Sequence, residues 1–152
     1  MSHRVQHWAI PFVTLLLMLG GGGVPATEVA TIKVLRGTVS VERNGQVLPG
    51  NLGLALEEAD QVVTGADSAL GMTFQDNSLL SLGPNSRLTV DRFQFNSTTH
   101  DGTFETSLKQ GKLAVVSGKI AKHKEDAMKV RTPSSIIGVR GTEFVVEVAA
   151  RR

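Results

Sequence analysis

VRTPSSIIGVRGTEFVVEV, residues 130–148, is the stretch of sequence that decides the fold class of this chain. Pro133 disfavours a helix before it, and the β-branched side chains among residues 136–139 favour an extended strand. Gly141 permits a bend in the backbone. Beyond it, residues 143–148 alternate between two faces at the period of a β-strand. The stretch therefore predicts two short strands joined by a bend.

The rest of the chain repeats this pattern of short aliphatic runs between turn residues, which is typical of an all-β domain. Asn44-Gly45 is the strongest hairpin signal and Asp101-Gly102 the next, because both pairs tolerate positive φ angles. Only residues 54–59 and 120–127 are compatible with helix. Allowing for mergers, we expect about nine or ten strands. The candidate segments are 32–36, 38–43, 46–48, 61–64, 69–74, 78–82, 87–95, 103–108, 112–116, 128–132, 136–139 and 144–148.

A weak internal repeat bears on the architecture. Residues 35–42, LRGTVSVE, are similar to residues 139–147, VRGTEFVVE. A strand-turn unit that buries its apolar face against a neighbouring copy is typical of a β-solenoid, although a β-sandwich also uses such units. The spacing does not choose between these two folds.

The N-terminus predicts an export signal over residues 1–26. Arg4 supplies a basic start, residues 8–19 an apolar core, and residues 20–23 a glycine break before Val24-Pro25-Ala26. We expect cleavage after Ala26, which leaves residues 27–152 as one domain in the periplasm. The alternative is an uncleaved membrane anchor. With no cysteine in the chain, disulfides and thiol acylation are excluded.

The charge of the chain is balanced overall and uneven along its length. Once Arg4 leaves with the signal, 15 basic residues face 14 acidic ones, so we expect no affinity for nucleic acid. Residues 28–107 hold 5 Lys/Arg and 10 Asp/Glu, whereas residues 108–152 hold 10 and 4. The two parts either face each other or solvent, or form a docking face.

Nothing in the sequence points to catalysis, a metal site or a cofactor. The domain offers only His100 and His123 as imidazoles, and both lie in polar, loop-like surroundings. The carboxylates of residues 57–76 lack the rhythm of a calcium loop. The domain has no Trp or Tyr, and its Phe residues fall in strand patterns that predict core positions. We therefore expect a protein that is not an enzyme.

The densest basic cluster lies in the segment from residue 119 to residue 131. Glu125 and Asp126 interrupt it, so a solvated loop is one interpretation. Contact with an anionic partner protein or a phospholipid headgroup is the other. The candidate partner-binding residues are Lys119, Lys122, His123, Lys124 and Lys129.

The stretch 130–148 resembles the motif that closes the FecR domain, named after the ferric citrate regulator of Gram-negative bacteria. The resemblance covers most of residues 27–152 and favours a solenoid-like all-β domain, with a compact sandwich as the alternative. Arg140 is expected to face solvent or a carboxylate, and the motif is expected to be structural. Its principal matching residues are Thr132, Pro133, Val139, Arg140, Gly141, Thr142 and Phe144.

The resemblance implies a non-enzymatic envelope module that recognises another protein or passes a signal. The anti-sigma segment and receptor-interacting domain of the ferric citrate regulator have no counterpart, so we do not expect its sigma-factor role. An envelope protein is the expected partner, and membrane contact would be indirect or through an uncleaved signal. A wall- or polysaccharide-binding module is an alternative, with a polar face supplied by Asn77, Ser78, Ser81, Asn85 and Ser86.

Overall fold

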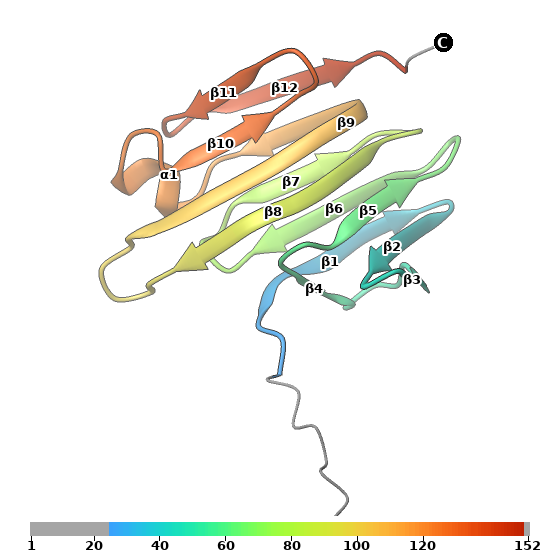
Figure 1. Cartoon of the computed structure of the whole chain (residues 1–152), viewed down its shortest axis with the longest axis horizontal. Helices are drawn as coiled ribbons and strands as arrows, with labels where there is room; N and C mark the ends of the chain where they lie inside the picture. The colour runs from blue at the N-terminus through green and yellow to red at the C-terminus, as the bar shows by residue number, and fades with distance from the viewer. Residues whose placement is uncertain (1–24, 151–152) are drawn as a thin grey trace, which may run out of the picture.

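The computed structural model describes residues 25–150, which form twelve strands and one short helix (Figure 1). The expected signal at residues 1–26 lies almost wholly outside the described residues. No helix of the described part is long and apolar enough to cross a membrane. The elements are β1 (Glu28–Arg36), β2 (Val39–Arg43), β3 (Gln46–Pro49), β4 (Ala55–Glu57), β5 (Gln61–Thr64), β6 (Ala69–Phe74), β7 (Leu79–Leu82), β8 (Arg87–Phe95), β9 (Gly102–Val116), α1 (Lys119–His123), β10 (Met128–Arg131), β11 (Ile136–Val139) and β12 (Glu143–Val148).

The strands form one curled sheet in the order β3-β2-β5-β8-β9-β7-β6-β1-β4, with β12 also paired to β9 and the β10–β11 pair attached to β9. The 15-residue β9 belongs to both halves of the sheet. Its first part pairs with β8 and β10, and its last six residues pair with β7 and β12. Gly111, at φ +92°, is the first residue of the second part. All strand pairs are antiparallel except β9 with β10, so the described residues do not show stacked solenoid rungs. The all-β prediction is confirmed.

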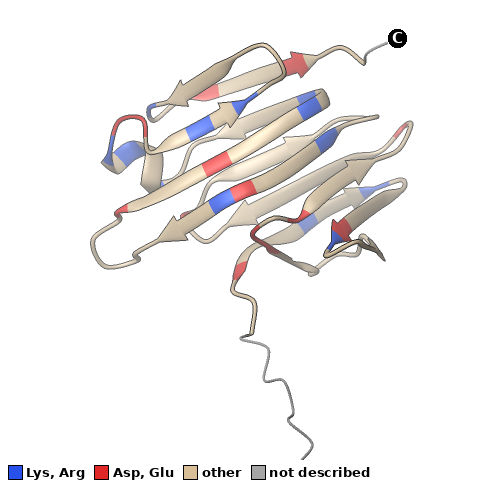
Figure 2. Ribbon diagram, in the orientation of Figure 1, with Lys and Arg blue, Asp and Glu red and all other residues tan. Residues whose placement is uncertain are grey.

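The two halves of the sheet differ in charge (Figure 2). One half, the front half, contains β8, the first part of β9 and β10, which carry both acidic and basic residues. The other half, the back half, contains β6 and β7, which carry none. In the back half, charge is confined to β1, β4 and β12 and to Lys112 of β9. The two outer faces therefore offer different surfaces to solvent.

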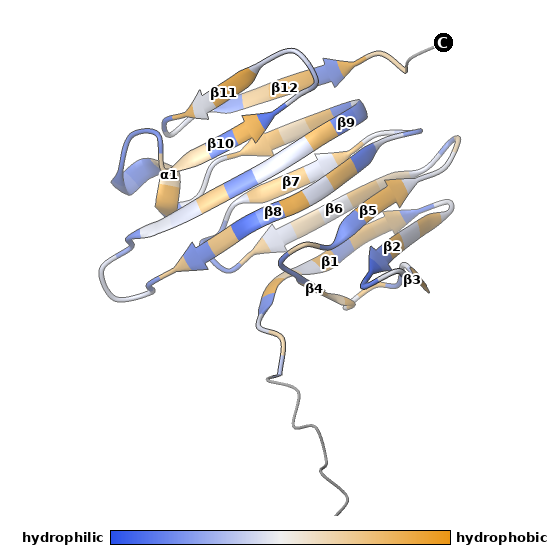
Figure 3. Cartoon of the chain, viewed as in Figure 1, coloured by the Kyte–Doolittle hydropathy of each residue, from blue (hydrophilic) through white to orange (hydrophobic). Residues whose placement is uncertain are grey.

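The core lies between the two halves. Hydrophobic and hydrophilic residues alternate along most strands, so each strand turns one apolar face inward (Figure 3). Phe74, Phe93 and Phe104 meet at its centre, with ring centroids 4.5–5.5 Å apart. These rings come from β6, β8 and β9, so they join the two halves. The prediction of core phenylalanines is confirmed at these three positions, whereas Phe95 is only half-buried.

Most expected strands are present, with several corrections. Residues 103–108 and 112–116 are one strand, and the described residues form twelve strands rather than the expected nine or ten. Residues 54–59 contain β4 and no helix, while only the start of 120–127 is helical. Asn44-Gly45 has the expected φ angles of +50° and +76°. In the 101–102 turn, however, the positive φ of +63° falls on His100. Gly102 is a glycine because a Cβ there would lie 2.2 Å from the carbonyl oxygen of Gln94.

Three turns of the domain share one device. In each, a residue with positive φ precedes a buried serine, and that serine's Oγ accepts a backbone N–H from a distant segment at 2.9–3.0 Å. A glycine in or beside that segment allows the backbones to approach, because a Cβ on it would lie 2.0–2.5 Å from atoms of the turn. These contacts hold the curled sheet at its rim. The turns are Asp67-Ser68 against Gly37, Asn77-Ser78 against Gly118, and Asn85-Ser86 against Gly111.

A charged cluster secures the opposite margin, where the sheet order ends in β3 and β4. Arg43 donates through Nε and Nη2 to the two carboxylate oxygens of Asp60, at 2.8 and 2.6 Å. It also donates to Glu57 at 2.6 Å and to the carbonyl of Ala55 at 2.9 Å. The hydrogen bond to Asp60 raises the pKa of Arg43 above its ordinary value. This cluster gives the short β4 a fixed place that its own sequence does not specify.

Candidate functional site

Helix α1 sits at one end of the curled sheet because the β6–β7 turn holds its start. The backbone N–H groups of Lys119 and Ile120 donate to the main chain and side chain of Asp76, at 2.7 and 3.4 Å. Gly118 donates to Ser78 Oγ at 2.9 Å, and Ile120 is completely buried. These contacts fix the backbone of a five-residue helix that would be unstable alone.

The basic side chains of α1 point away from this anchored base. Lys122, His123 and Lys124 are exposed, and Lys119 is half-buried. A shallow cavity of about 320 Å³ is lined by Lys119, Lys122 and His123, together with His100. The structure thus brings together a part of the basic cluster expected from the sequence, and we call Lys119, Lys122, His123 and Lys124 the basic site.

The acidic residues that interrupt the cluster in sequence do not neutralise the basic site. The carboxylate of Glu125 binds Arg140 Nη1 at 3.1 Å, which confirms the expectation that Arg140 faces a carboxylate or solvent. A Cβ on Gly138 would lie 2.6 Å from Asp126 Oδ1, so this glycine lets β11 approach the loop. Within the described residues, no ion pair involves the three lysines of the basic site.

The closing motif of the chain supports the basic site. Gly141 has φ +58°, which confirms the expected bend, and its nearest neighbour is Lys122 Cγ, which a Cβ would meet at 3.6 Å. The carbonyl of Thr142 accepts the N–H of Ser117 at 3.2 Å, just before α1. Val139 is buried, and Phe144 packs against the core. Thr132 and Pro133 form a turn far from α1, in which Thr132 N donates to the carbonyl of Ser135 at 2.8 Å.

Lys129 does not belong to the basic site. It is half-buried on β10, where it lies in register with Glu105 of β9, and it does not line the cavity. The sequence missed two residues that do belong to the surroundings of α1. His100 lines the cavity, and Asp101 binds His123 Nε2 at 3.1 Å. Both come from the β8–β9 turn, and no local pattern connects that turn with α1.

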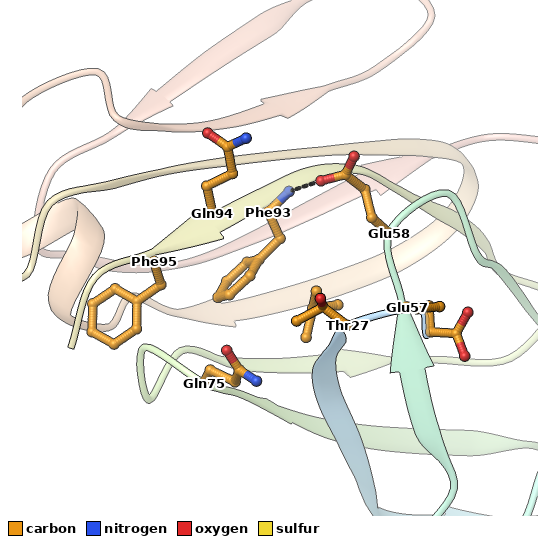
Figure 4. Close-up of a pocket in the computed structure, with 9 residues that line it drawn as sticks. Thr27, Glu57, Glu58, Gln75, Phe93, Gln94 and Phe95 are labelled. Atoms are coloured by element: carbon orange, nitrogen blue, oxygen red, sulfur yellow. Dashed lines mark hydrogen bonds between the residues drawn. The ribbon is translucent and has the colours of Figure 1, made fainter. Parts of the chain in front are cut away.

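A second cavity, of about 530 Å³, lies where the N-terminal segment enters the domain (Figure 4). Its carboxylates are already bound: Glu58 accepts the N–H of Phe93 at 2.9 Å, and Glu57 pairs with Arg43. Gln75 donates to the carbonyl of Glu28. Phe93, at its wall, is 6% exposed. The cavity therefore offers a polar rim whose groups serve the fold.

The two histidines each contact a neighbouring side chain. His100 stacks on Phe95 with ring centroids 6.2 Å apart, and His123 pairs with Asp101. Neither accepts a hydrogen bond from a serine or threonine hydroxyl in residues 25–150. The same residues contain no group of three side chains placed to hold a metal ion.

The polar face expected for polysaccharide binding is interrupted. Ser78 and Ser86 are completely buried, and their hydroxyl groups are engaged in the turn contacts described above. Only Asn77, Ser81 and Asn85 of that set are exposed. The alternation in the sequence did not reveal this, because a turn serine and a strand serine look alike.

Comparison with known families gives one match. The model of the family described as FecR protein matches residues 60–152, which is more than half of the chain and includes α1 and the closing motif. Searches of curated proteins and of solved structures gave no match.

Proposed function

This chain belongs to the FecR family, and from that premise we propose that it is a non-enzymatic module of the cell envelope that recognises a partner protein through the basic site. The family suggests an envelope or signalling-related regulator. The observation that carries the finer assignment is the basic site itself. Its three lysines, which form no ion pair within residues 25–150, lie on and directly after a helix whose backbone is fixed by Asp76 and Ser78.

The chemistry of the site favours an acidic protein surface. Lysine amines on a fixed backbone lose little backbone entropy on binding, and exposed charges of one sign steer an oppositely charged partner during encounter. A free anion would find no bidentate donor there, since the site has lysines and a histidine but no arginine beyond Arg140, which Glu125 holds. We place the domain in the periplasm, after removal of residues 1–26.

The edge strands extend this proposal. Within residues 25–150, β11 pairs only with β10 and β12 only with β9, so each leaves one edge for an added strand. The turn joining these two strands lies against α1. A partner that bound the basic site would therefore lie next to both edges.

The test begins with a photo-crosslinking residue at Lys124, which is exposed and outside the shallow cavity, followed by identification of the crosslinked envelope protein. Lys122→Glu combined with Lys124→Glu should then weaken that complex about tenfold or more, because two attractions become repulsions. The matched control is Lys109→Glu, an exposed lysine on the outer face of β9. Equal affinity of the double variant and the control would refute the basic site as the docking surface.

Two further measurements distinguish the alternatives. Cell fractionation with the intact mass of the protein tests the location: a periplasmic species beginning at Thr27 supports the proposal, and an unprocessed membrane-bound species supports an anchored regulator instead. Sedimentation with peptidoglycan tests the wall-binding alternative, for which we expect no retention.

A further inference from the structure

The outer face of the back half of the sheet is almost without charge. Five of its strands, namely β12, the end of β9, β7, β6 and β1, have pairing registers that place outward-facing residues in rows across the sheet. The short β4 continues the sheet beyond the start of β1. In two of these rows, Glu143 of β12 is the single charged residue. The first row is Glu143, Val116, Leu79, Thr73 and Thr31; the second is Val145, Ala114, Ser81, Gly71 and Val34.

This face, which we call the smooth face, also exposes aliphatic side chains. Val145 and Val34 are 63% and 60% exposed, and Leu79 and Val116 are 45% and 37% exposed. Small residues fill the space between them, and a Cβ on Gly71 would lie 3.0 Å from Val34 Cβ, so the surface is flat and tightly filled. Contiguous apolar surface of this kind marks interaction sites on soluble proteins.

In one row of the smooth face, the charges at the two margins have opposite signs. On β12, Glu143 and Glu147 are exposed, and Glu147 lies 3.5 Å from Lys112. On β1, Lys33 and Arg36 are exposed toward the end of the strand, whereas Glu28 is exposed at its start, where it accepts a hydrogen bond from Thr31 Oγ1 at 2.8 Å. Arg36 is in register with Ala69 and lies in the same row as Glu147. In the row that ends in Glu147 and Arg36, one margin is therefore acidic and the other basic.

We propose that the smooth face binds the smooth face of a second copy of this chain, with the two-fold axis running along β7. Rotation about this axis sets β12 of each copy against β1 of the other. Glu147 then lies opposite Arg36, and Val145 opposite Val34. Leu79 lies next to the axis and meets its own counterpart. Apolar residues thus meet apolar residues along the second row, and opposite charges meet at both ends of the Glu147–Arg36 row, as a self-complementary two-fold interface requires.

The Glu147–Arg36 row also favours this direction of the axis. A two-fold axis across the strands would set β12 against β12, and Glu143 would then face Glu147 of the second copy. Like charges brought together at an interface oppose association, whereas opposite charges steer it and fix its register. The outer face of the front half gives no comparable pattern, because acids and bases alternate across it.

The size of the smooth face predicts a weak dimer. Five strands at about 4.8 Å spacing and about six residues at about 3.4 Å give a flat area of roughly 500 Å² per copy. The two copies together would bury about 1,000 Å², which is at the low end for specific interfaces. We therefore expect a reversible dimer that is populated at high concentration.

The first test is sedimentation velocity of the protein as purified from the exporting cell, in low salt and over a wide range of concentration. We expect monomers to convert to dimers as concentration rises. Leu79→Lys should weaken this association at least about tenfold, because it brings two charges together beside the axis. Val47→Lys is the matched control, since Val47 is 68% exposed on the distant β3. A monomer at all concentrations, or equal effects of the two variants, would overturn the proposal.

The second test uses charge reversal and does not depend on an apolar substitution. Glu147→Arg and Arg36→Glu should each remove the dimer, because each variant sets like charges against each other at both ends of the interface. An equal mixture of the two variants should form a heterodimer, since opposite charges then meet at both ends. A mixture that stays monomeric, or a variant that dimerises alone, would overturn the proposal.

Discussion

Substituting Asp60 should reveal how much of the stability of this domain depends on one buried carboxylate. Asp60 is 1% exposed and accepts three N–H groups: two from Arg43, at 2.8 and 2.6 Å, and the backbone N–H of Glu57 at 2.8 Å. In Asp60→Asn, the amide keeps one acceptor oxygen and turns its NH₂ group toward a donor. The guanidinium of Arg43 then loses its buried counter-charge.

The magnitude follows from burial. Removing one partner of a buried ion pair costs about 3–5 kcal/mol, because the other charge stays buried without compensation. Here Arg43 is 21% exposed and keeps Glu57 and the carbonyl of Ala55, so part of that penalty is avoided. We therefore expect a loss of about 2–4 kcal/mol in the free energy of unfolding. For a domain of this size, that loss lowers Tm by about 10 °C.

Urea unfolding and thermal melting of the purified variants check this value. The matched control is Asp67→Asn, because Asp67 is exposed and its φ of +55° is one that asparagine tolerates. The measurements should use dilute protein, so that self-association does not raise Tm. If Asp60→Asn melted within about 2 °C of Asp67→Asn, the reasoning about the buried cluster would be wrong.

Three further predictions concern the fold. Gly111→Ala should lower the free energy of unfolding by more than about 2 kcal/mol, whereas Gly53→Ala should cost only about 1 kcal/mol. Both glycines have positive φ, but a Cβ on Gly111 would lie 2.0 Å from Ser86 Oγ, whereas one on Gly53 would meet nothing within 4 Å. Equal urea midpoints of the two variants would contradict the close approach of Gly111 to Ser86. Gly141→Val should cost about 1–3 kcal/mol from backbone strain alone, and an unchanged Tm would refute the bend. Phe104→Ala should cost about 3–5 kcal/mol, because the ring is completely buried, and near-native stability would place the centre of the core elsewhere.

Local alternation was enough to predict most strands, because each strand buries one face and period-two patterning records that directly. It failed where long-range contacts decide. Residues 55–57 form β4 because Arg43 and β1 hold them, and neither contact leaves a local pattern. β9 continues through Gly111, although a glycine in the sequence predicts a break there. The position requires a glycine because Ser86 occupies the space that a side chain would need.

The basic site, too, could be predicted from the sequence only in part. Its lysines were found because they are close in sequence, and Lys129 was included for that reason alone. Their freedom from acidic neighbours depends on Arg140 binding Glu125, and the shape of the site depends on the β8–β9 turn. The repeated turns were a missed signal: Ala-Asp-Ser, Asp-Asn-Ser and Pro-Asn-Ser recur at residues 66–68, 76–78 and 84–86, and each ends in a buried serine.

The two proposals have a joint consequence, because a two-fold axis along β7 leaves the direction of that strand unchanged. The basic site lies at the end of the sheet where Asp76 holds α1, just before Leu79. Both copies in the dimer would therefore carry their basic sites at the same end, and a partner with two acidic surfaces could bind both. Such binding gains from effective concentration without any new contact.

This consequence can be measured separately from either proposal. Leu79→Lys leaves every residue of the basic site in place, so its affinity for a partner with a single acidic surface should not change. Its affinity for an immobilised or dimeric partner should fall, because the second attachment is lost. Equal loss of affinity for both kinds of partner would show that the smooth face contacts the partner itself. No loss for either would show that the two basic sites act independently.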